Sequence, residues 1–456
     1  MWSCFDPWRT AAASLDALAV GGGTHAALAA RQQSRLAALL QAAARGSPLY
    51  RERLDRGRRT SLCDVPPVDK SELMQRFDEW VTDPRLRLAE LRAFAADASR
   101  IGDAFEGDFV VWESSGSSGE PAIFVQDARA MAVYDALEAC RGASRWLDSW
   151  RVDDRIAFVG ATGGHFASSV SVERLRRLNP GIAQRVRSFS FLQRTDALVE
   201  QLNRHAPAIV ATYPTAAVLL AEERAAGRLT IAPREVSTGG ETLTLGMRRC
   251  IEHRFGCTVA NNYGASEFLP LAWQCRSGAL HLNSDWVILE PVDEQLRPVP
   301  PGMAGSTTLL TNLANHVQPL IRYDLGDRVV VHPQRCACGS PLPTIDVQGR
   351  CDDMVVLRNG RGRGVRLLPL ALTTVLEDDA GVFDFQLVQL DARALQLTVG
   401  ADAGSTERAR AALAAYLKRQ GLPHVRIEVH AGTHCVQGRS GKLQRVVARE
   451  GEPLAA

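Results

Sequence analysis

Short apolar runs alternate with amphipathic stretches from about residue 104 onward, and this alternation constrains the fold more than any other feature of the sequence. The runs have the length of buried strands, and the stretches between them repeat apolar residues at helical spacing. The predicted strands are Asp108–Trp112, Ile123–Gln126, Ile156–Gly160, Ala208–Thr212 and Val236–Ser237, and the predicted helices lie near 129–143, 195–205, 215–226 and 241–255. Strands that alternate with helices indicate a layered α/β fold.

The segments on either side differ in character. Residues 25–60 have apolar positions at helical spacing, so we expect helix there and in the Ala-rich start of the chain. Residues 285–358 are rich in strands and Pro/Gly turns, and residues 351–456 carry their own strand–helix alternation. The pattern predicts a large α/β domain over 1–350, with a strand-rich sub-domain, and a small α+β domain over 351–456.

Charge and cysteine content narrow the class of protein. The 456 residues include 53 Lys and Arg against 51 Asp and Glu, and this balance argues against nucleic acid or an acidic membrane as the main partner. No apolar run reaches the roughly 20 residues that span a bilayer. Asp6 and Asp16 interrupt the Ala-rich start, which no basic stretch precedes, so we do not expect a signal peptide. A cytoplasmic location follows, in which the ten cysteines are thiols or metal ligands.

Lysine is rare in this chain. Only Lys70, Lys418 and Lys442 are lysines, and every other basic residue is arginine. A GC-rich genome explains the bias, but each lysine then raises the question of whether an ammonium is required at that position. Arginine does not replace a compact point charge on a flexible stem.

A run of small residues lies between two predicted strands and reads Ser114-Ser115-Gly116-Ser117-Ser118-Gly119. Its hydroxyls and unhindered backbone amides can wrap phosphate oxygens. Neither the Walker pattern nor the Rossmann glycine spacing accompanies it. A flexible hairpin turn explains the composition equally well.

Further motifs follow in order along the chain. Ser237-Thr238-Gly239-Gly240-Glu241-Thr242 ends a strand, where a planar ligand could lie on the backbone or Thr238 could cap a helix. Tyr263 and Tyr323 each precede a carboxylate, Glu267 and Asp327, by four residues; a tyrosine can stack on a base and a carboxylate can hold Mg²⁺. Gly349-Arg350-Cys351-Asp352-Asp353 and Ser440-Gly441-Lys442 complete the order. Taken singly, each motif also suits a turn.

The order and intervals of these motifs resemble those of the adenylate-forming superfamily, which contains acyl-CoA ligases, peptide-synthetase adenylation domains and luciferase. Within it, the chain looks most like the phenylacetate–CoA ligase branch, whose opening is similar to SPLYRERL…DVPPVDKSEL here. The resemblance runs over nearly the whole length. It implies a large N-terminal domain that binds ATP and acid, and a small mobile C-terminal domain.

The resemblance also implies a role for each motif. Ser114–Gly119 would cover the β- and γ-phosphates of ATP, and Gly239, Gly240 and Glu241 would line the adenine site, with Tyr263 stacked on the base. Glu267 would hold Mg²⁺, Asp327 the ribose hydroxyls, and Arg350 would bind near ribose and phosphate. Asp352 would be the hinge of the small domain.

Lys442 would bridge the attacking carboxylate and the α-phosphate, a role that suits a mobile ammonium because negative charge develops on both groups. His165, Phe166 and Gly264 would line the acyl pocket. As a lone histidine, His165 is otherwise more often a core or surface residue.

Four cysteine and histidine residues form a second pattern. Cys336 and Cys338 lie two apart in a turn that ends in Gly339, and Cys275 and His281 lie on a preceding segment rich in turn residues. Such a Cys₃His set would close a tetrahedral structural zinc site, and members of the resembled branch carry zinc at similar spacing. Four unrelated side chains are the alternative, and Cys250, His253 and Cys257 compete as ligands.

Two segments depart from the resembled pattern. Asp324 stands where an arginine is common. A Gly/Arg hairpin of a few extra residues carries Arg358, Arg361 and Arg363 before the segment at Val365. These arginines could meet the phosphates of coenzyme A or an acidic carrier protein, or form a solvated hairpin.

The expected activity is ATP- and Mg²⁺-dependent activation of an aryl or arylalkyl carboxylic acid as an acyl-adenylate, followed by transfer to the thiol of coenzyme A. One alternative is transfer to a carrier-protein phosphopantetheine or to an amine. Another is a nucleotide-binding zinc protein without ligase activity, which the presence of Lys442 and Glu267 disfavours. A homodimer is left open, and no nucleic acid or membrane is expected as a partner.

Overall fold

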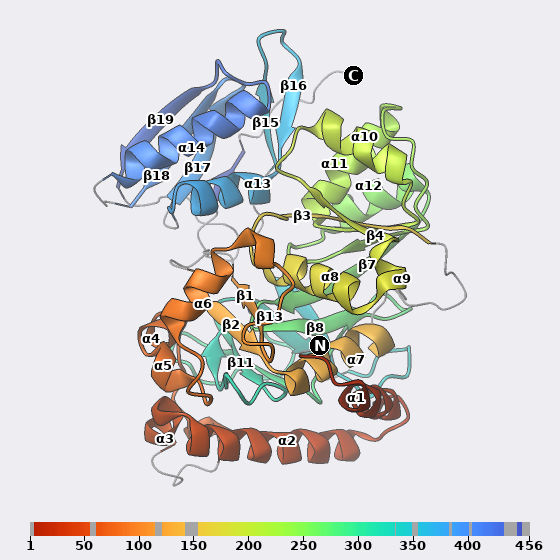
Figure 1. Cartoon of the computed structure of the whole chain (residues 1–456). Coiled ribbons are helices and arrows are strands. Elements are labelled where there is room, and N and C mark those ends of the chain that lie inside the picture. The colour runs from red at the N-terminus through yellow and green to blue at the C-terminus, as the bar shows by residue number, and fades with distance from the viewer. Residues whose placement is uncertain are drawn as a thin grey trace.

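The computed structural model describes residues 4–54, 61–114, 121–141, 154–332, 334–348, 354–382, 385–400, 404–432 and 445–448. Within these ranges it is a mixed α/β structure, as the alternation predicts (Figure 1). No helix in this part of the chain is both long and apolar enough to cross a bilayer.

A nine-stranded sheet organises the molecule, in the order β13-β14-β9-β8-β7-β6-β5-β3-β4. One half is parallel: β3 (Ile156–Gly160), β4 (Val186–Ser190), β5 (Ile209–Thr212), β6 (Glu235–Thr238) and β7 (Thr258–Ala265). The other half is antiparallel: β8 (Phe268–Gln274), β9 (Leu280–Leu282), β13 (Arg328–His332) and β14 (Thr344–Gln348). β3 and β5 are fully buried apolar runs, as is typical of parallel strands covered on both faces.

Helices connect and cover the parallel half. They are α7 (Ala128–Arg141), α8 (Ala167–Leu178), α9 (Pro180–Ala183), α10 (Thr195–His205), α11 (Pro214–Ala225) and α12 (Leu245–Phe255). The predicted helix near 195–205 matches α10, and those near 129–143 and 215–226 match α7 and α11 to within a few residues. The alternation did not reveal β4 or α8.

The N-terminal part is helical and packs against two small sheets. Its elements are α1 (Pro7–Val20), α2 (His25–Gly46), α3 (Pro48–Arg53), η2 (Leu62–Asp64), α4 (Lys70–Gln75), α5 (Phe77–Trp80), α6 (Leu88–Ala95) and η3 (Ala98–Arg100). The helix expected over 25–60 breaks at Ser47, because the Ser47 side chain caps a new helix that starts with Pro48. The sheets are β1 (Val110–Glu113) with β2 (Ile123–Gln126), and β10 (Val287–Val292), β11 (Thr307–Asn312) and β12 (Tyr323–Asp324).

The C-terminal elements form two further sheets, β15-β16 and β19-β18-β17-β20. They are β15 (Val355–Arg358), β16 (Gly364–Leu367), α13 (Pro369–Thr374), η4 (Val375–Asp379), β17 (Phe385–Asp391), β18 (Ala394–Val399), α14 (Ser405–Arg419), β19 (Arg426–Ala431) and β20 (Val446–Val447). In Figure 1 they lie beside α10–α12, and one apolar cluster joins the two groups. The proposed domain boundary at 350/351 lies outside the described residues and stays a prediction.

Candidate active site and metal centre

A cavity of about 1720 Å³ lies at the carboxyl ends of the parallel strands. Ala161 after β3, Tyr213 after β5 and Gly239 after β6 line it, as do residues of α13 and η4 from the C-terminal part. Ligands of open α/β sheets bind at this edge, because the strand ends and the loops after them converge there. The topology therefore places the cavity where a binding site is expected.

The loop after β6 forms one wall of the cavity. Gly240 has φ +77°, and a Cβ there would lie 2.8 Å from a ring carbon of Tyr213, so only glycine fits. The Glu241 carboxylate accepts hydrogen bonds from the backbone N–H (3.0 Å) and the hydroxyl (2.8 Å) of Thr215. Gly239, Gly240 and Glu241 thus present a flat, fixed backbone surface to the cavity.

The interpretation of Thr238 as a helix cap is wrong. Thr238 is the last residue of β6, and its hydroxyl donates to the Ala260 carbonyl oxygen at 3.0 Å. α12 begins later, at Leu245, where the Thr244 hydroxyl accepts from the backbone N–H of Met247. Because Gly240 has a left-handed backbone, the chain forms a loop after β6, and α12 begins only after this loop.

Two tyrosines hold two carboxylates that line the cavity. The Tyr263 hydroxyl donates to Asp327 Oδ2 at 2.9 Å. Burial raises the pKa of Glu267, while a hydrogen bond from the Tyr323 hydroxyl and the positive charge of Lys70 act against that rise. All five side chains line the cavity, so the predicted Mg²⁺ and ribose carboxylates do converge.

A β-bulge shapes this corner. The register of β7 against β8 shifts between Tyr263 and Ala265, and a Cβ on Gly264 would lie 2.1 Å from the Leu269 carbonyl oxygen. Gly264 is therefore required for the close approach of the two strands. Asp324 also lines the cavity, and its carboxylate accepts from Gly326 N–H (2.9 Å) and from the Thr307 hydroxyl.

Ser114 marks the start of the Ser/Gly loop. It closes the β1–β2 hairpin, because its N–H donates to the Ala122 carbonyl oxygen (2.9 Å) and its Oγ accepts from Ala122 N–H (2.9 Å). Ser114 also lines the cavity. Ser115–Gly119, Arg350, Asp352 and Lys442 lie outside the described residues, so their roles stay predictions.

The side chains of His165 and Phe166 lie in different surroundings. Phe166 lines the cavity. His165 is fully buried, its ring lies 5.3 Å from that of Phe94, and it is absent from the cavity lining. Its carbonyl oxygen accepts from Glu113 N–H at 2.8 Å, which ties this segment to β1.

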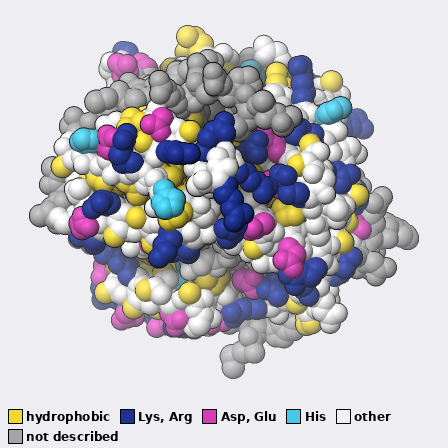
Figure 2. All heavy atoms as spheres, turned by 90° about the horizontal axis from the view of Figure 1, so that it is seen from above, with side chains coloured by type: hydrophobic (Ala, Val, Ile, Leu, Met, Phe, Trp, Pro, Cys, Tyr) yellow, Lys and Arg dark blue, Asp and Glu magenta, His cyan; other side chains and the backbone are white. Residues whose placement is uncertain are grey.

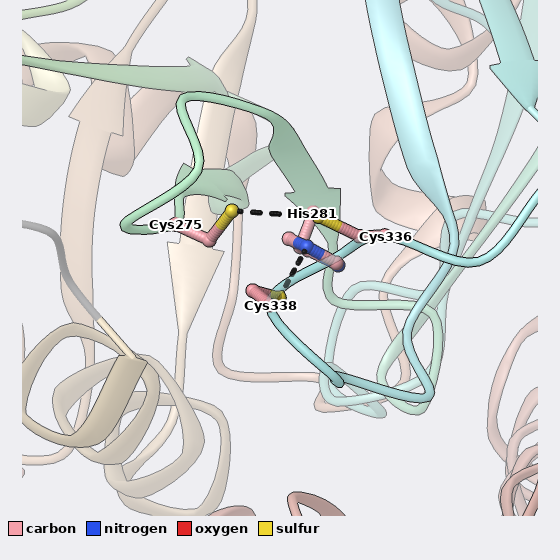
Figure 3. A group of neighbouring side chains, drawn as sticks. All are labelled: Cys275, His281, Cys336 and Cys338. Carbon is pink, nitrogen blue, oxygen red and sulfur yellow. Dashed lines mark hydrogen bonds between the residues drawn. The ribbon is translucent and has the colours of Figure 1, made fainter.

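The four predicted zinc ligands meet in one place (Figure 3). The ligand atoms of Cys275, His281, Cys336 and Cys338 lie within 4.8 Å of one another. The Sγ atoms of Cys275 and Cys336 are 3.7 Å apart, and Cys338 Sγ is 3.2 Å from His281 Nε2. Cys275 directly follows β8, and His281 lies in β9. Cys336 and Cys338 lie in the β13–β14 loop, so the cluster joins two segments of the sheet.

The surroundings of this cluster suit a metal. His281 Nδ1 lies 2.8 Å from the Leu342 carbonyl oxygen, an arrangement that leaves Nε2 to face the thiols. Trp273 stacks on the His281 ring at 5.3 Å. Among the described residues, this is the one group of three or more potential ligands, and the competing residues Cys250, His253 and Cys257 do not join it.

Three contributors to the site have no role assigned to them from the sequence. Thr215 fixes Glu241, Tyr323 donates a hydrogen bond to Glu267, and Lys70 lines the cavity from the N-terminal part. Tyr323 lay inside a recognised motif and Lys70 was conspicuous as a rare lysine. Nothing in the sequence near Thr215 indicates its role, because its partner is 26 residues away.

Comparison with solved structures gives the fold independent support. A structure of 2-hydroxyisobutyryl-CoA ligase with 2-HIB-AMP and CoA in the thioesterification state matches with a TM-score of 0.56 and 22% identity, over 91% of this chain and 88% of that one. The same ligase in the postadenylation state matches with a TM-score of 0.53 and 22% identity, over 92% and 89%. This chain has the fold of the adenylate-forming enzymes.

The match extends over nearly the whole of both chains, so it includes the C-terminal elements as well as the large sheet. No protein-family model and no curated protein matches the chain. The resemblance to the phenylacetate–CoA ligase branch therefore stays a prediction.

Proposed function

We propose that the chain is an AMP-forming acid:thiol ligase. A carboxylate oxygen of the substrate attacks the α-phosphorus of ATP, the bond to the bridging oxygen breaks, and pyrophosphate leaves with the electron pair. A thiolate, from coenzyme A in the first instance, then attacks the acyl carbon and displaces AMP. Both steps need positioning and charge stabilisation more than covalent chemistry by the protein.

One observation carries the proposal. Four motifs that are far apart in the sequence, beginning at Ser114, Gly239, Tyr263 and Tyr323, converge on one cavity at the carboxyl ends of the parallel strands. Turn residues that served only local structure would have no reason to meet there. The matching ligase structure contains 2-HIB-AMP and CoA, and these ligands support the same chemistry.

Each wall of the cavity suits one part of the substrates. The loop of Gly239, Gly240 and Glu241 would enclose adenine together with the Tyr263 ring. Asp327 would accept hydrogen bonds from the ribose hydroxyls. Glu267 would hold Mg²⁺, which offsets phosphate charge when bound. Lys442 would act between carboxylate and α-phosphate.

An aryl or arylalkyl acid is the proposed substrate. The cavity is lined by aromatic side chains, namely Phe158, Phe166, Tyr134 and Tyr213. Offset or edge contacts with these rings would favour an aromatic acid over an aliphatic one of equal size. The resemblance to the phenylacetate–CoA ligase branch gives the same expectation.

The test is acid-dependent exchange of labelled pyrophosphate into ATP, over a panel of aryl and aliphatic acids. We expect exchange with one acid class in the wild type and its loss in Lys442→Ala. Lys418→Ala is the matched control, because Lys418 is an exposed residue of α14. No exchange with any acid, together with tight ATP binding, would favour the nucleotide-binding protein without ligase activity.

A carrier protein is the second candidate for the molecule whose thiol receives the acyl group. The reason is that basic side chains gather at one end of the C-terminal part of the chain. The β15–β16 hairpin places Arg358, Arg361 and Arg363 beside the β17–β18 turn with Arg393, and Arg358 N–H donates to the Ala392 carbonyl oxygen at 2.6 Å. These four arginines are exposed, form no ion pair with another described residue, and line no part of the cavity.

Figure 2 looks down on this end of the molecule, where dark blue basic side chains predominate over magenta acidic ones. An open basic surface suits an acidic protein better than a small nucleotide, which a pocket would enclose. Replacement of Arg358, Arg361 and Arg363 by serine would then slow acyl transfer to a carrier protein and leave transfer to free coenzyme A unchanged. Equal loss with both acceptors would assign the arginines to coenzyme A.

The cysteine–histidine cluster is the proposed site of a structural Zn²⁺. Three thiolates and one imidazole fill a tetrahedral set and leave no open position for catalysis. Such an ion would hold the β13–β14 loop against the β8–β9 segment.

A further inference from the structure

One part of the cavity is lined by helices and has no role in the proposed nucleotide contacts. The residues proposed for adenine, ribose and Mg²⁺ come from the segment between β6 and β13. The helix-lined part is formed by side chains of α1, α7 and α8, which lie near one another (Figure 1). The whole cavity, of about 1720 Å³, exceeds the roughly 300–1,000 Å³ of common small-molecule pockets. The helix-lined part therefore has room for a further portion of a substrate.

The helix-lined part follows most of the length of α8. Ser168, Ser171, Leu175 and Leu178 line it, and their spacing of three or four residues places them on one face of that helix. At 1.5 Å per residue, this face is about 15 Å long. Its near end lies at the proposed acyl pocket, because Ser168 is hydrogen-bonded to Tyr213. An acid bound in that pocket can thus extend along α8, away from its own carboxylate.

Three charged side chains line the helix-lined part, and two of them neutralise each other. Arg174 donates to both carboxylate oxygens of Asp135, at 2.8 and 2.9 Å. The third is Glu138, about one turn further along α7, which forms no hydrogen bond or ion pair with another described residue. Although its side chain is accessible to solvent, the protein around it and the charge of Asp135 raise the pKa of the Glu138 carboxyl to about 7. Glu138 thus lacks a counter-charge among the described residues.

Local structure does not favour a carboxylate at position 138. Glu138 lies in the last turn of α7, which ends at Arg141, and the helix dipole disfavours negative charge at that end. Asp135, three residues earlier on the same helix, adds like-charge repulsion. Residues that break local rules in this way are expected at functional sites. A ligand of opposite charge would explain the carboxylate.

We propose that the helix-lined part of the cavity binds the far end of the acid substrate, and that Glu138 accepts a hydrogen bond from an amine there. The inference rests on the proposed function and deepens it, because it names the substrate class: an arylalkyl acid with an amine at the end opposite its carboxylate. The aromatic body would lie between Tyr134 and Phe166, which both line the cavity. The ammonium supplies the counter-charge that Glu138 lacks. No bond to the amine forms or breaks, because activation takes place at the carboxylate.

The alternative is that Glu138 is only a solvated residue at the edge of the cavity. A solvated carboxylate has no effect on the choice between acids of equal size. A binding carboxylate favours an ammonium over a methyl group by about 10-fold to 100-fold, the usual worth of a hydrogen bond to a charged group. The charge at the far end of the substrate therefore distinguishes the two roles.

The experiment measures acid-dependent pyrophosphate exchange with matched arylalkyl acids that end in an ammonium, a methyl or a sulfonate group, at three chain lengths. At the best length, the wild-type kcat/KM should be about 10-fold to 100-fold higher with the ammonium than with the methyl group. Glu138→Gln should abolish this preference, and Glu138→Lys should shift it to the sulfonate. Glu90→Gln, at an exposed position of α6 away from the cavity, is the matched control and should keep the wild-type preference.

The methyl-ended acid reports on folding, because all variants should use it as the wild type does. A wild type without preference for the ammonium would overturn the proposal. So would a Glu138→Gln variant that keeps the preference, including one that loses activity equally with every acid.

Calorimetric titration with the same acids separates this proposal from the proposed function. If no acid supports exchange, the ligase assignment fails, and the helix-lined part is judged by binding alone. Tighter binding of the ammonium-ended acid by the wild type than by Glu138→Gln would support it. Equal binding by the two proteins, or no binding by the wild type, would refute it.

Discussion

Single side chains set the electrostatics of the cavity. At Tyr263, the contribution of the hydroxyl and that of the aromatic ring can be measured separately. Tyr263→Phe removes the bond to Asp327, and we expect it to cost about 1.5 kcal/mol of unfolding free energy with a small rise in the KM for ATP. Tyr263→Ala also removes the ring, so the KM should rise by about 10-fold to 100-fold if the ring stacks on adenine. Urea unfolding and exchange kinetics measure the two effects. An equal KM for both variants would contradict a stacking role.

Glu267 combines a cost in stability with the role at Mg²⁺ that we propose for it. Burial raises its pKa above the ordinary 4.5, so between the two values the folded state binds more protons than the unfolded state. Stability therefore falls as pH rises through that window. Glu267→Gln removes this dependence, so without Mg²⁺ the Tm of the variant relative to wild type should increase as the pH rises above 4.5.

The same substitution should reduce pyrophosphate exchange by about 100-fold, because the amide cannot replace the carboxylate at Mg²⁺. Mg²⁺ should raise the Tm of the wild type and not that of the variant. A variant that Mg²⁺ still stabilises would place the metal on other residues.

At the scale of elements, the cysteine–histidine cluster connects segments that backbone pairing joins weakly. β9 pairs with β14 at only two positions, Thr344↔His281 and Ile345↔Leu280. If zinc binds there, Cys338→Ser should lose it and lower the Tm by several degrees, because metal binding free energy adds to folding free energy. Elemental analysis and thermal unfolding measure both, with the exposed Cys63→Ser as control. Equal zinc content in the two variants would contradict the assignment.

At the scale of the whole molecule, the C-terminal part of the chain packs on the α10–α12 side through specific contacts. Arg366 Nε lies 2.7 Å from Glu222 Oε2, and Gln420 Nε2 donates to the Leu192 carbonyl oxygen at 2.9 Å. The proposed rotation of the small domain between half-reactions would break these contacts. A disulfide between Glu222→Cys and Arg366→Cys should therefore leave one half-reaction and abolish the other.

Reduction of that disulfide should restore both half-reactions. The two single cysteine variants, treated with the same oxidant, control for damage to other thiols. If the oxidised double variant completes both half-reactions at the wild-type rate, the small domain does not rotate about this interface.

Local features of this protein can be predicted from its amino-acid sequence. The ligand set Cys275, His281, Cys336 and Cys338 was one of several interpretations of the spacing, and the family resemblance favoured it. The strand at Ile123–Gln126 and the helix at 195–205 follow from periodicity alone. Such patterns depend on neighbours a few residues away, and the free energy that fixes them is largely local. The order of the motifs along the sequence likewise predicted the fold of the adenylate-forming enzymes, which the structural comparison confirms.

Which side chains share the cavity depends on how distant segments of the chain pack together. His165 and Phe166 are neighbours in sequence, yet one packs on Phe94 and the other lines the cavity. Lys70 lines the cavity with Tyr323, and the adjacent Val68 pairs with Tyr323, a contact that no spacing rule contains. Long-range packing chooses among surfaces that the sequence leaves equivalent, so the site is complete only when the distant segments meet.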